Sequence, residues 1–229
     1  MEPHRPVHPP KSAQVCLEAL AAQGLGNRNS LGGAFGLMHY FEYRLTSDLV
    51  PWWQPNITYS ERQKVVTALE KTLRAFGPVK TRAWGDVVSI ELKSEGKQVF
   101  SFQIAQRSAQ LEPAVPSPWK DVLLDSFDDL VANKMVALVE RGAPCDFLDI
   151  YQICYESLAT ALRCWQLWCR RQELANSDTD LARARLAVLT HMARIEQHRP
   201  LDSVADDNAR AEAKRVRMWF KEEFVNVLS

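Results

Sequence analysis

Hydrophobic residues recur along this chain with two different periods, and the change between them lies near residues 118–126. Before it, apolar and polar residues alternate along segments of residues 79–105, which predicts strands there. The expected strands are 79–84, 87–92 and 98–105, with a hairpin turn at 94–97 between the last two. After the change, apolar residues recur at helical spacing, and the expected helices are 126–141, one starting at Pro144, 156–173, 178–197 and 206–228.

Shorter patterns complete the first half of the chain. A capping box formed by Ser60 and Gln63 predicts the start of a helix that ends before Gly77. Further elements are expected as a helix at 12–22, a short helix at 34–41, a strand at 43–50 and a loop at 51–55. The domains are then a proline-rich flexible arm at 1–11, an α+β domain at 12–122 and a helical domain at 123–229.

Composition and charge narrow the class of protein. The formal net charge is zero, so no global basic field holds nucleic acid without specificity. Five cysteines without a C-x-x-C pair argue against a disulfide framework or a zinc site. The first residues lack an apolar signal segment, and no apolar run has the length of a membrane span. We therefore expect a cytoplasmic protein with no membrane partner.

The first group of candidate functional residues is a small-residue turn followed by a lone carboxylate. Gly32 and Gly33 have no Cβ, so backbone amides can approach a triphosphate there. Asp48 could hold Mg²⁺, but Val50 stands at the second position of a D-x-D pair and cannot. The alternative is structural, because Gly-Gly often precedes a helix without binding phosphate and a lone aspartate often serves a turn.

Other nearby positions offer little to complete a metal site. The neighbouring strand presents Ser101 and Gln103, and Gln103 has only a neutral amide oxygen. Glu91, on the preceding strand, is the only nearby acid able to substitute.

The second group combines two cations and two acids on consecutive helical turns. Lys134 and Arg141 share one helical face, and Asp146 and Asp149 share a face of the next helix. The turn at 142–144 would fold these helices together into a compact cluster. Spacing alone favours a structural reading, in which Arg141 binds Asp146 or Asp149 in a bidentate ion pair.

Together the two groups resemble the AbiEii/AbiGii-type nucleotidyltransferase toxins, a family of bacterial toxin and phage-defence proteins. The matching segments are Gly32-Gly33-Ala34, Arg44-Leu45-Thr46-Ser47-Asp48, and the run from Asp129 to Asp149. The resemblance spans about residues 26–155. It implies a nucleotidyltransferase-like mixed β-sheet domain with an all-helical C-terminal bundle. Two departures stand out, namely Val50 and a cysteine, Cys145, where the family often has a basic residue.

The resemblance also implies residue roles. The site would catalyse transfer of a nucleotide from an NTP to an acceptor such as tRNA, with Mg²⁺ as cofactor and a cognate antitoxin as partner. The implied catalytic residues are Asp48, which would also hold the metal, Lys134 and Asp146. The implied nucleotide-binding residues are Gly32, Gly33, Ser47, Lys134, Arg141 and Asp149.

Competing interpretations remain at this stage. Val50 and Gln103 favour a catalytically degenerate nucleotide-binding or protein-interaction module on the same fold, or a structural subunit of a larger complex. Trp52-Trp53 is either a base-stacking platform or, more simply, a packed loop. Arg210, Lys214, Arg217 and Lys221 form a stripe that either touches RNA or faces solvent.

Overall fold

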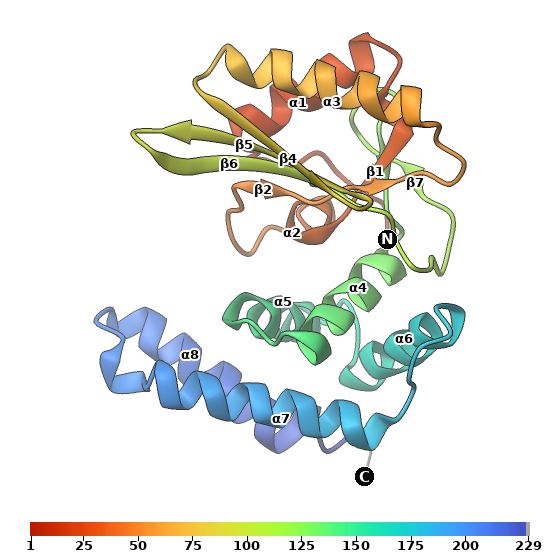
Figure 1. Ribbon diagram of the computed structural model, residues 1–229. Helices are drawn as coiled ribbons and strands as arrows, with labels where there is room; N and C mark the ends of the chain where they lie inside the picture. The colour runs from red at the N-terminus through yellow and green to blue at the C-terminus, as the bar shows by residue number, and fades with distance from the viewer. Residues whose placement is uncertain (228–229) are drawn as a thin grey trace. The chain divides into compact units, whose positions relative to one another are not determined.

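The computed structural model describes residues 1–227 and divides the chain into two compact units, Met1–Leu130 and Val131–Ser229 (Figure 1). The first unit is mixed α/β and the second is built from helices. The prediction of an α+β region followed by a helical region is therefore confirmed. Helix α4 (Phe127–Glu140) spans the division.

The first unit contains two four-stranded mixed sheets. One has the strand order β3-β1-β8-β7 and the other β2-β6-β5-β4. The strands are β1 (Asn29–Leu31), β2 (Asp48–Leu49), β3 (Trp52–Trp53), β4 (Val79–Trp84), β5 (Val87–Ser94), β6 (Lys97–Ile104), β7 (Val115–Pro116) and β8 (Leu123–Leu124). The helices are α1 (Lys11–Ala22), α2 (Gly33–Leu37) and α3 (Tyr59–Arg74).

The register of the second sheet separates an apolar face from a polar one. Strand β2 runs parallel to β6 with Asp48 opposite Ser101, and β5 runs antiparallel to β6 with Glu91 opposite Ser101. Directly paired residues share a face of a sheet. The opposite face carries Leu49, Ile90, Leu92, Phe100, Phe102 and Ile104, all buried. Helices α1 and α3 lie over this apolar face, and α2 lies on the other side of the sheet (Figure 1).

Several local predictions are corrected by the structure. The segment expected as a loop at 51–55 contains β3, which pairs with β1 through Trp52 and Ser30. The strand expected at 43–50 is reduced to β2. Helix α3 is capped by Thr58 and Glu61 rather than by Ser60 and Gln63. The hairpin turn is confirmed, since Ser94 pairs with Lys97.

The N-terminal arm follows the surface of the first unit and joins it at several points. The backbone nitrogen of His4 donates to the His39 carbonyl at 2.7 Å. The backbone nitrogen of Val7 donates to the Glu42 carboxylate at 2.5 Å. The Arg5 guanidinium lies 3.9 Å from the centre of the Trp119 ring.

The second unit packs its helices around an aromatic core. Its helices after α4 are α5 (Pro144–Tyr155), α6 (Ala161–Leu174), α7 (Leu181–His198), α8 (Asp207–Trp219) and a π-helical turn at Phe220–Phe224. The helix expected from 156 begins only at Ala161, where Thr160 caps it, because Ser157 has a positive φ of 57°. Residue 228, in the expected last helix, lies outside the described residues.

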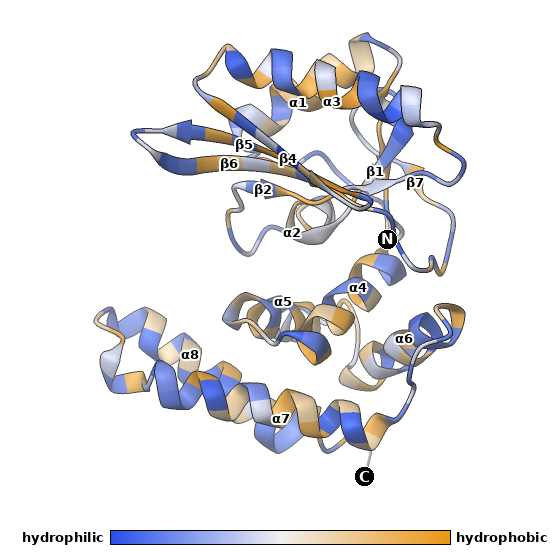
Figure 2. Ribbon diagram, in the orientation of Figure 1, coloured by the Kyte–Doolittle hydropathy of each residue, from blue (hydrophilic) through white to orange (hydrophobic). Residues whose placement is uncertain are grey.

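The hydropathy of the helices agrees with one-sided burial. In Figure 2, hydrophilic and hydrophobic residues are interleaved along α1, α3 and α7, as expected for helices with a single buried face. Among residues 1–227, no helix has the length and apolar character needed to span a membrane.

A buried ion pair holds the first sheet to the segments that follow β6 and β8. The Arg107 guanidinium donates to Asp125 Oδ1 at 2.6 Å and to Ser30 Oγ at 2.5 Å. Ser30 Oγ donates to the same Asp125 oxygen at 2.6 Å. Burial raises the pKa of Asp125 to about 6, although the charge of Arg107 and the Ser30 hydrogen bond oppose the shift.

This carboxyl predicts a pH dependence of stability. The folded-state pKa of about 6 lies above the ordinary 3.8, so the stabilisation from the bound proton is complete below pH 3.8 and is lost as the pH rises through 6. We expect the free energy of unfolding of wild type, minus that of Asp125→Asn, to fall by roughly 3 kcal/mol between pH 4 and 7. Urea titrations across this range measure it, and a difference that stays flat or rises with pH contradicts it.

Candidate functional site

The glycine turn between β1 and α2 is packed tightly against the end of β2. Gly33 has a positive φ of 63°, a conformation that glycine adopts without strain. A Cβ on Gly32 would lie 2.6 Å from Trp52 Nε1, and a Cβ on Gly33 would lie 3.2 Å from Val50 Cβ. Both glycines therefore allow Trp52 and Val50 to pack closely on the turn. The turn lies beside the strand that carries Asp48.

Asp48 stands half-buried on the polar face of the second sheet. Its Oδ1 accepts a hydrogen bond from Ser101 Oγ at 2.5 Å and a longer one from Gln98 Nε2 at 3.5 Å. Ser47 is exposed, and its carbonyl accepts from the backbone nitrogen of Ser101 at 3.0 Å. These contacts fix the Asp48 carboxylate against β6.

The side chains near Asp48 make a sparse set of metal ligands. Glu91 is separated from Asp48 by β6, with Ser101 between them, and its carboxylate lies 3.5 Å from the Arg82 guanidinium. Among the described residues, no group of three or more His, Cys, Asp or Glu side chains could hold a metal ion. Mg²⁺ often binds one protein carboxylate and completes its shell with substrate phosphates and water. The donors fit one such ion at Asp48 and do not fit a two-metal site.

The candidate cations and acids of the second unit form two ion pairs, one buried on both sides and one in which the Arg141 side chain is 63% exposed. Arg141 binds Asp146 in bidentate fashion, with Nε and Nη2 each 2.8 Å from a carboxylate oxygen. Lys134 Nζ pairs with Asp149 Oδ2. Both aspartates are fully buried. The hydrogen bonds to Asp146 raise the pKa of the Arg141 guanidinium.

The turn between α4 and α5 explains why these pairs form. Gly142 has a positive φ of 52°, and a Cβ there would overlap the His191 ring. The next residue, Ala143, donates its backbone N–H to Asp146 Oδ2 at 3.0 Å. Both oxygens of Asp146 are thus occupied by donors. This is the geometry expected from the structural reading of the cluster.

The eight candidate residues fall into two sets, one in each unit. The first set, Gly32, Gly33, Ser47 and Asp48, is assembled within the first unit. The second set, Lys134, Arg141, Asp146 and Asp149, is assembled within the second.

The remaining sequence candidates have largely structural positions. Trp53 is fully buried, and Trp52 packs on the glycine turn, as the packed-loop reading expects. The basic stripe on α8 is interrupted, because Arg217 is buried and donates to the Arg199 carbonyl at 2.6 Å. Sequence reasoning missed the Arg107–Asp125 pair, since neither residue belongs to a recognisable motif.

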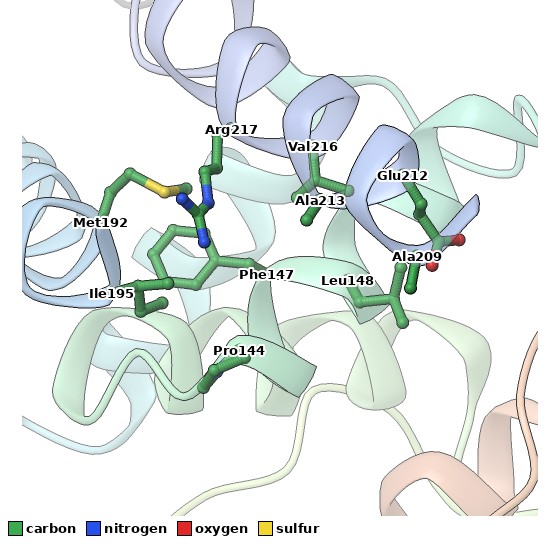
Figure 3. A pocket seen from close by; sticks show the side chains of 10 residues that line it. All are labelled: Pro144, Phe147, Leu148, Met192, Ile195, Ala209, Glu212, Ala213, Val216 and Arg217. Atoms are coloured by element: carbon green, nitrogen blue, oxygen red, sulfur yellow. The ribbon is translucent and has the colours of Figure 1, made fainter. Parts of the chain in front are cut away.

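A small pocket lies in the second unit between α5, α7 and α8. Its walls are mainly apolar, and Figure 3 shows the Arg217 side chain directed toward Phe147 with Glu212 at the other end. Its volume is about 150 Å³. That is well below the roughly 300 Å³ at which small-molecule sites begin. The pocket is too small for a nucleotide.

Three solved structures match this chain over most of its length. JHP933 from Helicobacter pylori has 14% identity and a TM-score of 0.46, covering 93% of this chain and 90% of its own. A candidate nucleotidyltransferase from H. pylori has 13% identity and a TM-score of 0.49, covering 95% of each chain. An antigenic nucleotidyltransferase-like protein from Paracoccidioides brasiliensis has 14% identity and a TM-score of 0.41, covering 88% of this chain and 92% of its own.

No protein-family model matches the chain, and no curated protein matches it. The structural likenesses have low identities and TM-scores below 0.5. No activity is concluded from them.

The Arg141–Asp146 pair gives a test of its structural role. Replacing Arg141 with Met leaves a buried carboxylate without two of its donors, which should lower the free energy of unfolding by about 1 to 3 kcal/mol. The double variant Arg141→Met, Asp146→Asn should recover part of this loss, because the uncompensated charge is gone. Denaturant titrations measure both. Equal stability of wild type and Arg141→Met rules out a stabilising role for the pair.

Proposed function

We propose that this protein binds an NTP and transfers its nucleotide to an acceptor, as an AbiEii-like nucleotidyltransferase. The observation that carries the proposal is the packing of the glycine turn against β2. Val50 lies so close to Gly33 that a Cβ there would come within 3.2 Å of it, and Asp48, in β2, lies two residues earlier in the chain. A turn able to accept phosphates and a carboxylate able to hold a metal therefore lie side by side within one unit.

Each proposed residue has a distinct task. The amides at Gly32 and Gly33 would receive the triphosphate, and the exposed Ser47 would lie along the nucleotide. Asp48 would hold one Mg²⁺ jointly with phosphate oxygens, and the ion would neutralise charge that develops during transfer. Lys134, in the second unit, keeps the phosphate-binding role that the resemblance implies. Arg141, Asp146 and Asp149 would orient that lysine and its helix.

The proposed biological setting follows from the resemblance. The acceptor would be a tRNA or another RNA, and the protein would act in the cytoplasm as the toxin of a toxin–antitoxin or phage-defence pair. The second candidate function is a catalytically inactive nucleotide-binding or protein-interaction module, which Val50 and Gln103 favour because neither supplies a carboxylate.

Calorimetric titration with each of the four NTPs, in Mg²⁺ or Mn²⁺, tests the nucleotide site. We expect metal-dependent binding that Asp48→Asn weakens at least about tenfold, because the variant loses the charge that holds the metal. Lys134→Ala should also weaken it. Because Lys134→Ala removes an ion pair of the buried Asp149, the folding of this variant is checked by circular dichroism. If no NTP binds folded wild type, the transferase proposal fails.

Val50→Asp tests whether position 50 is a metal-ligand position of the proposed site. The new carboxylate would stand two residues after Asp48 and restore a D-x-D pair, so Mg²⁺-dependent NTP affinity should rise by about tenfold. Val50→Asn is the matched control, with similar size and no charge, and should show no such gain. Equal effects of the two substitutions would show that Val50 does not occupy a metal-ligand position.

A further inference from the structure

A row of exposed residues on the edge strand β4 lies on the same face of the sheet as Asp48. Lys80 pairs with Glu91, which pairs with Ser101, which pairs with Asp48. Since paired residues share a face, Lys80 belongs to the Asp48 face, and Arg82 and Trp84 follow at alternate positions of the same strand. We call Lys80, Arg82 and Trp84 the β4 row.

The β4 row is unusual in its exposure. Trp84 is 53% exposed, although tryptophan is among the most buried residues on average. Lys80 is exposed, and the Arg82 side chain is 52% exposed. The other face of β4 meets α3, where Thr81 Oγ1 donates to Glu70. Residues 80–84 are exposed on both faces of the strand, so the β4 row is open to a ligand.

The chemistry of the β4 row matches a single-stranded nucleic acid. Lysine and arginine contact phosphates, and an exposed indole stacks on an unpaired base. Open sheet faces with aromatic residues bind single-stranded RNA in this way in other folds. Strand β4 lies three interstrand spacings, about 14 Å, from β2, and Trp84 lies about 13 Å further along the strand than Lys80. On the same face between the two strands, Ser89, Glu91 and Ser101 are buried, so the β4 row is a site at the edge of the sheet. Because the net charge of the chain is zero, contact with RNA requires a local cationic surface such as this row.

We propose that the β4 row binds the single-stranded 3′ end of an RNA acceptor at the edge of the sheet that carries Asp48. The proposal rests on the transferase function proposed above and assigns the acceptor to a surface of the first unit. Glu91 modulates binding, because its carboxylate lies 3.5 Å from the Arg82 guanidinium and competes with phosphate for it.

Fluorescence anisotropy with the full chain tests this surface. The probe is a labelled single-stranded RNA of about twelve nucleotides, a length within the usual range for such sites. We expect Trp84→Ala to weaken binding about tenfold, through loss of base stacking. Arg82→Ala should weaken binding severalfold. It should also lower the slope of the logarithm of the binding constant against the logarithm of salt concentration by about one.

Two further variants exclude an indirect structural effect. Glu91→Gln should tighten RNA binding, because it frees Arg82, and a merely structural ion pair would not give a gain. Arg74→Ala is the matched control, since Arg74 is an exposed arginine of α3, the helix that covers the opposite face of the sheet. It should bind RNA like wild type.

The outcomes separate this inference from the transferase proposal. If wild type does not bind the RNA, if Trp84→Ala and Arg82→Ala bind it normally, or if a fully paired duplex binds equally well, the β4 assignment is overturned. Calorimetry with NTP on Trp84→Ala should match wild type. If wild type does not bind NTP but the variants change RNA affinity as expected, the transferase proposal fails. The β4 row then remains an RNA-binding surface.

Discussion

The register of β6 between β2 and β5 is the constraint on which the first unit depends. Alternate residues of β6 point to opposite faces, so Phe100 and Phe102 reach the core under α1 and α3 while Ser101 lies beside Asp48. A shift by one residue would exchange the two faces and bury polar groups without partners. The core and the candidate site are therefore specified by the same pairing.

Three buried aspartates of the two units are ion-paired, whereas Asp48 is half-exposed and, among the described residues, is not. In the second unit, Asp146 and Asp149 are fully buried and each is bound to a basic side chain, which gives their helices a defined packing. In the first unit, Asp125 is equally buried and paired with Arg107, whereas Asp48 remains half-exposed and is held by Ser101. Among these four aspartates, Asp48 is the one available to a ligand without breaking an ion pair.

Much of the fold followed from sequence patterns, and the failures share a cause. The hairpin at 94–97 and the helix after Ser126 are local features, set by turn and capping residues, and they were predicted. Strand β3 was missed because Trp52-Trp53 lies between prolines and becomes a strand only by pairing with distant β1. Helical spacing predicted the cluster of Lys134, Arg141, Asp146 and Asp149 but left open which aspartate Arg141 binds. Arg107 was not predicted, since its partner Asp125 is brought near only by the tertiary fold.

The contact between Val50 and Gly33 has a consequence for how metal and protein are linked. Two adjacent carboxylates would repel each other in the absence of an ion, and a metal would then stabilise the folded state. A valine in that place packs close to the turn and introduces no such repulsion. At the proposed site, folding would therefore not depend on the supply of divalent ions. A metal at Asp48 would arrive as part of the metal–nucleotide complex and leave with the products, as a component of the substrate rather than of the protein.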